Sequence, residues 1–220
     1  MKNFHYRFLE TNKDLLVLES TLRKIFDSTS ENIVSATEIV EVDIVVQHDP
    51  QNVIPELGIS GQYTNEARRI DIYLDLDNSH LKDNLRAEVA RTLVHEYMHV
   101  VREQYFEWEN GTLLDSLIAE GLTQSFEIEI LPNLSPAIYA TAFNESELGD
   151  LWMRAKNILN QRGLVNEEWF FGSDTLRRWS GYSLGFKLVQ DKIMATGLKA
   201  SQLYKLPATD FIIDKKRRIL

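Results

Sequence analysis

The hydrophobic pattern changes its period near Ser79, and this change limits the possible fold more than any other feature of the sequence. Before it, "TEIVEVDIVV" and "RIDIYLDLD" alternate apolar and polar residues, which is the period of half-buried strands. After it, apolar residues recur at helical spacing and predict helices over 80–104, 112–128, 145–161, 174–196 and 199–205. Strands followed by helices are typical of an α+β fold with helices packed on one side of a small mixed sheet.

Two earlier segments complete the predicted fold. Residues 11–27 have the pattern of an amphipathic helix. The segment "GISGQYTNEARR", residues 58–69, has the pattern of a glycine-marked strand and turn and predicts a hairpin with the "IDIYLDL" strand. Because no repeat, low-complexity tract or Gly/Ser linker interrupts the sequence, we expect one domain over 1–220. Its sheet and buried helix would occupy 1–105, and its helical half 106–220.

Composition excludes several classes of partner and site. The net charge of −9 argues against a nucleic-acid or anionic-membrane partner, and we interpret the basic run "DKKRR", residues 214–218, as a solvated end. The N-terminal residues have no signal-peptide h-region, and no apolar stretch is long enough to cross a bilayer, so we expect a cytoplasmic protein. The chain has no cysteine, so any bound metal must be held by His, Asp or Glu.

The segment "TLVHEYMHVV", residues 92–101, contains the pattern HExxH. On a helix over 80–104, His95 and His99 lie one turn apart, and Glu96 lies beside them. The apolar residues around them form a broad arc, whereas the polar ones form a stripe: Glu88, Arg91, Thr92, His95, His99 and Arg102. Two imidazoles that converge on one ion, with an adjacent carboxylate for proton transfer, predict a zinc site. The alternative is a structural helix whose two histidines have ordinary hydrogen-bond partners.

A catalytic zinc ion needs a third protein ligand and one position open to water. An HExxHxxGxxH motif is excluded, because Arg102 and Tyr105 stand where glycine and histidine would be required. His5, His48 and His80 precede the motif and lie in no recognisable ligand pattern. The remaining source is a carboxylate from the following helix.

Two carboxylates of the helix over 112–128 compete for this position. Glu120 lies in the middle of its polar stripe, which comprises Ser116, Glu120, Thr123, Gln124 and Glu127. The following Gly121 would let the helix approach another backbone closely. Asp115 is the second candidate, although together with Thr112 it forms a plausible capping box that explains the start of the helix.

HEYMH, "TLLDSLIAEGL" and "WSGYSLGF" together resemble the predicted zinc-dependent proteases of the gluzincin type, a bacterial family otherwise labelled as a domain of unknown function. The resemblance covers about residues 57–195. It implies a zincin-like fold with a thermolysin-like core, in which one helix carries HExxH and a second helix supplies a glutamate ligand. Two positions depart from the pattern. Gln124 replaces the aspartate that orients a ligand histidine, and Met98 stands where the family more often has histidine.

The resemblance also implies a mechanism. His95, His99 and Glu120 would bind one Zn²⁺, and Glu96 would accept a proton from the water that attacks a peptide carbonyl. The substrate would be a peptide or protein. Tyr182 is the candidate hydrogen-bond donor to the oxyanion, because a phenol can donate and the neighbouring glycines permit tight packing. A tyrosine between Trp179 and Phe186 is more often a core residue.

Several alternatives remain open at this stage. The chain could be a catalytically inactive or latent zincin scaffold with a binding or regulatory role, or it could hydrolyse a non-peptide amide or ester. Residues 58–64 could pair with an extended substrate or form an ordinary hairpin. The aromatic residues that could line a pocket or fill the core, which we favour, are Trp152, Trp169, Phe170 and Phe171. Substrate and oligomeric state do not follow from the sequence.

Overall fold

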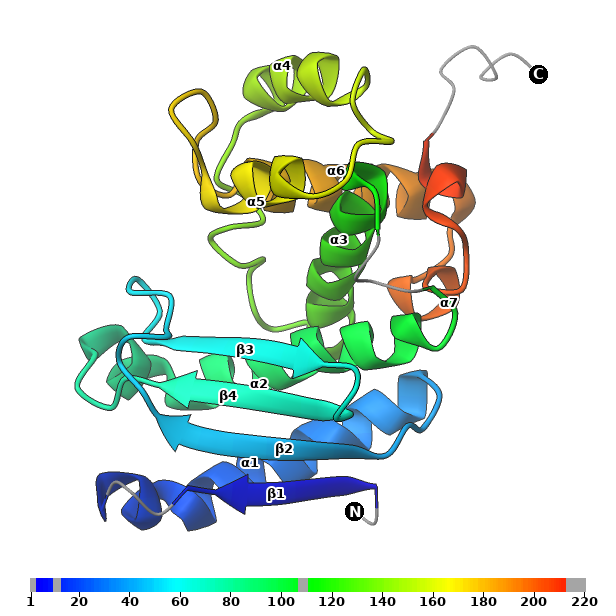
Figure 1. Cartoon of the computed structure of the whole chain (residues 1–220). Helices are drawn as coiled ribbons and strands as arrows, with labels where there is room; N and C mark the ends of the chain where they lie inside the picture. The colour runs from blue at the N-terminus through cyan, green and yellow to red at the C-terminus, as the bar shows by residue number, and fades with distance from the viewer. Residues whose placement is uncertain (1–2, 10–12, 107–110, 213–220) are drawn as a thin grey trace. The chain divides into compact units, whose positions relative to one another are not determined.

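The computed structural model describes residues 3–9, 13–106 and 111–212 (Figure 1). The basic run at 214–218 lies outside these residues. The chain falls into two compact units, residues 1–101 and 102–220. The single-domain organisation stays a prediction.

The first unit is built on a four-stranded mixed sheet with the strand order β1-β2-β4-β3 (Figure 1). Its elements are β1 (Phe4–Phe8), α1 (Lys13–Ala36), β2 (Val42–His48), β3 (Ile59–Thr64), β4 (Arg69–Leu74) and most of α2 (Ser79–Glu103). Strand β2 pairs in parallel with both β1 and β4, whereas β3 is the antiparallel outer strand beside β4. The predicted hairpin and the predicted α+β class are therefore confirmed.

Helices α1 and α2 pack on the same face of this sheet. The ring of Phe4 on β1 stacks on Tyr97 of α2, with 5.0 Å between ring centroids. Tyr6, two residues further along the same face, stacks on Phe26 of α1 at 5.2 Å. The alternating residues Val42, Ile44, Val46, Ile70, Ile72 and Leu74 are buried, as the period of two predicts.

The first unit differs from the sequence prediction in three places. Strand β1 was not predicted, and α1 continues to Ala36 rather than ending near residue 27. Strand β2 begins at Val42, so residues 37–41 are not part of it. The reason lies in α2, because the Tyr97 hydroxyl accepts a hydrogen bond from Val40 N–H and lies within donating distance of two carbonyls, those of Glu38 at 3.1 Å and Val40 at 3.2 Å. These backbone groups therefore bond to a side chain instead of a neighbouring strand.

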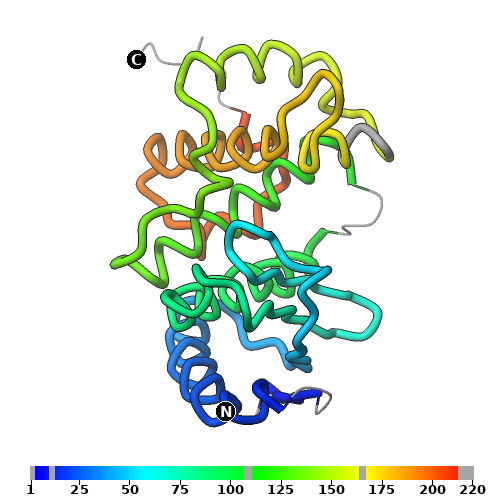
Figure 2. The backbone as a smooth tube through the Cα atoms, turned by 90° about the vertical axis from the view of Figure 1, so that its left-hand side faces the viewer, coloured from blue at the N-terminus to red at the C-terminus, as the bar shows by residue number. Residues whose placement is uncertain are grey.

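The second unit is mainly helical, as predicted. It contains the last two residues of α2, followed by α3 (Leu113–Ile130), α4 (Glu145–Ala155), α5 (Leu164–Phe171), α6 (Ser180–Thr196), α7 (Ala200–Leu203) and the 3-10 helix η1 (Ala208–Phe211). Figures 1 and 2 show that α3 and α6 cross. Within the described residues, no helix combines the length and apolar character needed to span a membrane.

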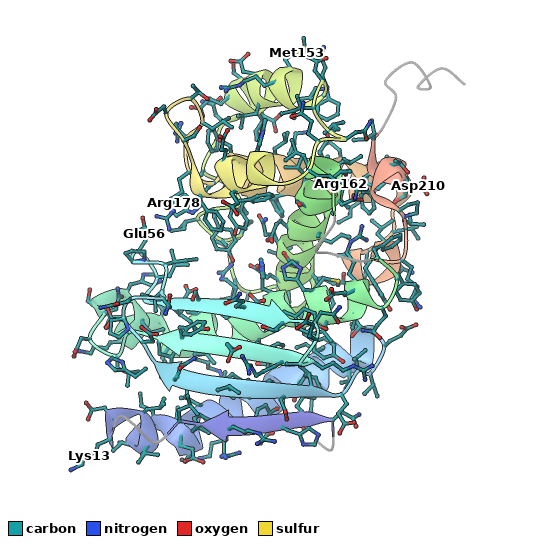
Figure 3. All side chains as sticks on the ribbon, in the orientation of Figure 1. Lys13, Glu56, Met153, Arg162, Arg178 and Asp210 are labelled. Carbon is teal, nitrogen blue, oxygen red and sulfur yellow. The ribbon has the colours of Figure 1, made fainter. Side chains whose placement is uncertain are left out.

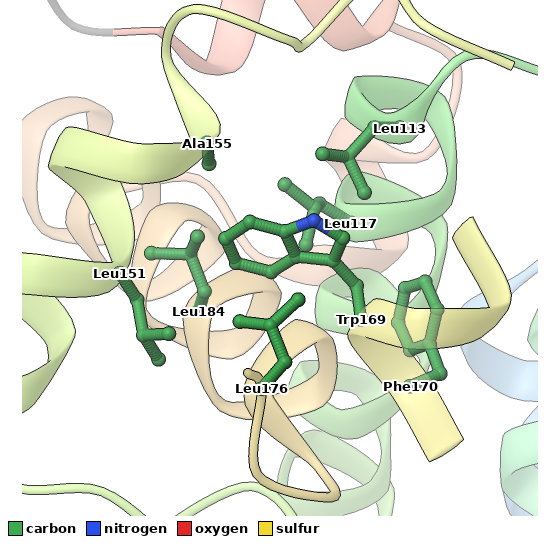
Figure 4. Close-up of a cluster of buried hydrophobic side chains, with 8 residues drawn as sticks. All are labelled: Leu113, Leu117, Leu151, Ala155, Trp169, Phe170, Leu176 and Leu184. Carbon is green, nitrogen blue, oxygen red and sulfur yellow. The ribbon is translucent and has the colours of Figure 1, made fainter. Parts of the chain in front are cut away.

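A cluster of apolar side chains around Trp169 forms a core of this unit (Figure 4). Its buried members are Leu113, Leu117, Leu151, Ala155, Trp169, Phe170, Leu176 and Leu184. Trp152 packs against it, so the core interpretation holds for Trp152, Trp169 and Phe170. It was wrong for Phe171, which is 71% exposed. Met153 also lies at the outer side of α4 (Figure 3).

Three helices, α4, α6 and the short α7, are shorter than expected, and one helix was missed. Helix α4 ends at Ala155 rather than near 161, because the carbonyls of Leu159 and Gln161 accept hydrogen bonds from the first N–H groups of α3. Helix α6 begins at Ser180 rather than 174, since Trp179 has a left-handed backbone with φ of 74°. Helix α5 precedes it and was not predicted.

Candidate metal centre

Helix α2 has one polar stripe on an otherwise buried surface. Leu93, Val94, Tyr97 and Met98 are fully buried, as the predicted apolar arc requires. The non-helical residue in α2, Asn84, lies about three turns before the motif, so the turns that carry HExxH are regular. The imidazole centroids of His95 and His99 are 5.2 Å apart, with 68° between the ring planes. The two rings are therefore neighbours, as their spacing predicts.

Tyr97 fixes the orientation of this part of α2. Its hydroxyl lies 2.8 Å from Val40 N and its ring stacks on Phe4, so it anchors the helix to the chain before β2 and to β1. Sequence reasoning placed Tyr97 only in the apolar arc and missed this role. A tyrosine among aliphatic residues was the available signal, because a buried phenol usually has a hydrogen-bond partner.

Helix α3 begins with the predicted capping box. The Asp115 backbone N–H donates to Thr112 Oγ1 at 3.3 Å, and Asp115 Oδ2 accepts from Thr112 N–H at 2.8 Å and from its hydroxyl at 2.7 Å. The predicted polar stripe that follows is entirely buried: Ser116, Glu120, Thr123, Gln124 and Glu127 are each less than 9% exposed. Burial of a carboxylate is costly unless it is paired or binds a metal.

His95, His99 and Glu120 form a group that could hold a metal ion. Each offers one ligand atom, and these atoms all lie within 4.8 Å of one another. Two imidazole nitrogens and one carboxylate oxygen are a donor set that suits zinc and leaves a fourth position open. The residues present therefore fit the expected ion.

The other candidate ligands lie elsewhere. The carboxylate of Asp115 is engaged in the capping box of α3, and among the described residues it is not part of the group that could hold a metal. His5 lies 2.8 Å from Glu41, and His80 lies 3.1 Å from Glu88. His48 accepts from Leu76 N–H at the end of β2. Within the described residues, none of these three histidines belongs to the group that could hold a metal.

Two glycines bring α3 and α6 into backbone contact. A side chain at Gly121 would meet the carbonyl of Gly185, and a side chain at Gly185 would meet the carbonyl of Leu117. The close approach expected at Gly121 is therefore present, and its partner is α6. Because Glu120 precedes Gly121, this contact also restrains the part of α3 that carries the candidate ligand.

Tyr182 lies on α6 and is partly buried. Its ring packs against Tyr139 at 5.3 Å and edge-on against Phe170 at 5.0 Å. Gln124 Nε2 donates to the Tyr182 carbonyl at 3.3 Å, so the residue that departs from the thermolysin-like pattern connects α3 to α6. The aromatic contacts fit a packing role, and a role in catalysis stays a prediction.

Arg102 anchors the last turn of α2 within the second unit. Its guanidinium donates to the carbonyls of Tyr204 and Leu206 at 2.7 and 3.2 Å and lies over the Phe106 ring. Burial lowers the pKa of Arg102 to about 10, against the opposing effect of Asp115. The sequence placed Arg102 on the polar stripe but contained no signal for its carbonyl partners, which lie about a hundred residues further along the chain.

Comparison with known proteins gives a family for this chain. The family model described as "Predicted Zn-dependent protease (DUF2268)" matches residues 19–213. The chain belongs to this family. A curated relative, "Uncharacterized protein YjaZ" of Bacillus subtilis (strain 168), is 27% identical over 131 residues, or 56% of this chain and 49% of the relative. The chain thus spans about half the length of the curated relative it matches. No solved structure matches.

Family membership tests the broad prediction of a family, and it does not test the finer predictions about fold type and individual residues. The expected family is confirmed, and its description is that of a predicted zinc-dependent protease. The gluzincin type, the zincin-like fold and the roles of individual residues remain predictions. The cytoplasmic location also remains one.

Proposed function

We propose that this protein is a zinc-dependent metallopeptidase of the gluzincin type, with a zincin-like fold. The observation that carries the proposal is the convergence of ligand atoms from His95, His99 and Glu120 within 4.8 Å. Further support comes from a family described as predicted zinc-dependent proteases. A mixed sheet packed on the helix that carries HExxH agrees with the proposed fold.

In this proposal His95, His99 and Glu120 hold one Zn²⁺. When bound, a zinc ion supplies Lewis acidity, which lowers the pKa of water and polarises a carbonyl group. Glu96 accepts the proton of the water that attacks the peptide carbonyl and then passes it to the leaving amine. Its buried position beside His95 supports this role, because proton transfer requires a carboxylate held close to the reacting atoms.

Tyr182 is the proposed hydrogen-bond donor to the oxyanion. Packing against Tyr139 and Phe170 restricts the directions in which its hydroxyl can point. Tyr182→Phe should lower kcat by about 10²-fold and leave the zinc content unchanged. An unchanged kcat would show that Tyr182 has a packing role only.

The outer strand β3 is the proposed docking edge for an extended substrate. It pairs with β4 along one side, and Gly61 in its middle lies against Glu96. A peptide added to this edge would gain backbone hydrogen bonds without a strong requirement for particular side chains. The substrate class is accordingly an extended peptide or an exposed segment of a protein.

Zinc content is the first test of the proposal. Elemental mass spectrometry of the purified protein should give about one zinc per chain. Glu120→Gln should lose most of it, because the ligand charge is removed, whereas Glu127→Gln is a matched control on the same helix with an equally buried carboxylate. Asp115→Asn should retain the metal. A protein that takes up no added zinc, or equal retention in all variants, would overturn the proposed site.

Glu96→Gln separates an enzyme from a binding or regulatory scaffold. The variant should keep its zinc and lose about 10²- to 10⁴-fold in peptide hydrolysis, because only the proton acceptor is removed. Cleavage of a peptide library is the direct measurement, with a panel of small amides and esters beside it. Zinc binding without cleavage of any peptide by the natural sequence would favour the scaffold, and cleavage restricted to small amides or esters would favour the non-peptide alternative.

A further inference from the structure

Gly61 stands in the middle of β3, where it pairs with Ile72 in a regular antiparallel ladder. Glycine weakens a strand interior, because it loses more backbone entropy than other residues and has no side chain to pack. Its φ lies outside the positive range in which other residues are strained. The backbone conformation therefore does not require glycine, and the relevant property is the missing side chain.

The space that a side chain would occupy is filled by Glu96. A Cβ atom at position 61 would lie 2.5 Å from Glu96 Cγ, 2.6 Å from its Oε1 and 2.8 Å from its Cδ. Non-bonded carbon atoms prefer separations of about 3.5–4.0 Å, so a methyl group and this Glu96 conformation exclude each other. The three nearest atoms all belong to one side chain, and that side chain is the proposed proton acceptor.

Both backbones that flank this contact are held in place. Strand β3 is bonded along β4 from Ile59 to Thr64. Glu96 lies within a regular part of α2, and its neighbour Tyr97 is bonded to Val40 and stacked on Phe4. When a methyl group enters, the side chain of Glu96 is therefore the part that must move.

We propose that Gly61 is a positioning residue for the Glu96 carboxylate. Because Gly61 has no side chain, the side chain of Glu96 fits between β3 and the backbone of α2. The position of its carboxylate beneath the strand edge is set by this contact. One glycine thereby fixes the distance between the proton acceptor and a substrate backbone aligned on β3. The catalytic meaning of this contact rests on the proposed function, whereas the contact itself does not.

A double-mutant cycle in thermal unfolding tests the contact without any need for activity. Gly61→Ala should lower the Tm when Glu96 is present, because the methyl group displaces a buried side chain. In the Glu96→Ala background the same change should leave the Tm unchanged or raise it, since the space is then free and alanine suits a strand better than glycine. Gln62→Ala, at an exposed position of the same strand, is the control and should behave alike in both backgrounds. An equal effect of Gly61→Ala in both backgrounds would overturn the proposal.

A crystal structure and kinetics of Gly61→Ala test the positioning role. We expect a displaced Glu96 side chain, an unchanged zinc content, a kcat lowered by about 10²-fold and a KM within about twofold of the natural value. Glu96 at its original place, with β3 shifted instead, would overturn the proposal, and so would a natural kcat. If the natural protein neither binds zinc nor cleaves peptides, the proposed function fails, while the thermal cycle and the crystal structure still decide whether Gly61 positions Glu96.

Discussion

Helices α2 and α3 supply the candidate ligands and accommodate polar side chains in different ways. On α2 two charged residues of the stripe pair with each other, because Glu88 lies 3.6 Å from Arg91, and Glu88 also lies 3.1 Å from His80 at the start of the helix. On α3 the hydroxyls of Thr123 and Ser125 donate to carbonyls of their own helix, at 2.6 and 2.7 Å. The α3 stripe is entirely buried, whereas His99 on α2 remains partly exposed.

The comparison shows two kinds of polar side chain on buried helices. Some bond to the backbone of their own helix, and others need a partner outside it. A buried hydroxyl can bond to the preceding turn, but a carboxylate or amide requires another donor or a metal. Glu127 bonds to Tyr139 at 3.2 Å, and Glu120 contributes to the candidate metal group. The two helices also differ in how they are held, because α3 depends on close packing and α2 on the hydrogen-bonded Tyr97.

The largest expected effect on stability comes from removing a side chain of the apolar core beside α3. Trp169→Ala should lower the free energy of unfolding by about 3–5 kcal/mol, because Trp169 is 1% exposed and fills the centre of its cluster. Urea denaturation measures the change. The neighbouring Phe171→Ala, at an exposed position, should change stability by less than about 0.5 kcal/mol. Similar losses of unfolding free energy for Trp169→Ala and Phe171→Ala would contradict the interpretation that packing around Trp169 restrains α3.

The contact between α3 and α6 should respond to a single methyl group. Gly185→Ala should destabilise by about 1–3 kcal/mol, since the added carbon meets the carbonyl of Leu117. Gly149→Ala on α4 is the matched control, because nothing lies within 4 Å of its Cβ position and alanine favours a helix. Denaturant titration of both should give opposite signs. A stabilising Gly185→Ala would mean that backbone proximity does not restrain α3.

Removal of one hydroxyl tests how α2 is held. Tyr97→Phe should cost about 1–3 kcal/mol, because Val40 N–H loses its acceptor while the ring stack on Phe4 is kept. Tyr63→Phe, at a partly exposed hydroxyl 3.3 Å from Asn65, should cost less. Hydrogen exchange at Val40 locates the effect. Unchanged protection there would show that the hydroxyl contributes little to the position of α2.

The smallest expected effect is a pH dependence in the sheet of the first unit. Burial raises the pKa of Tyr6 from 10.0 to about 12, although its hydrogen bond with Ser30 acts in the opposite direction. The folded state therefore holds this proton at pH values where the unfolded state has lost it, so stability falls as pH rises from about 10 towards 12. Tyr6→Phe should lose less stability than the natural protein in urea titrations over this range. Equal losses would contradict the assignment to Tyr6.

Short-range patterns accounted for much of the fold. The β3–β4 hairpin, the capping box at Thr112 and Asp115 and the regular turns of α2 each depend on residues close together in the sequence. Strand β1 was missed because its five residues pair with β2, far along the chain. The C-terminal end of α4 and the start of β2 were misplaced because distant groups, the first turn of α3 and the Tyr97 hydroxyl, take the backbone hydrogen bonds.

The sequence by itself determined that two histidines and a glutamate share one turn of a buried helix, because helical spacing is a local property. It also determined a polar stripe on the next helix, with Glu120 and Asp115 both open as the third ligand. Only the tertiary structure shows that Glu120, rather than Asp115, belongs with His95 and His99 to the group that could hold a metal ion. It alone decided that Gly61 lies against Glu96. Such contacts depend on how separate elements pack, and no local spacing encodes that.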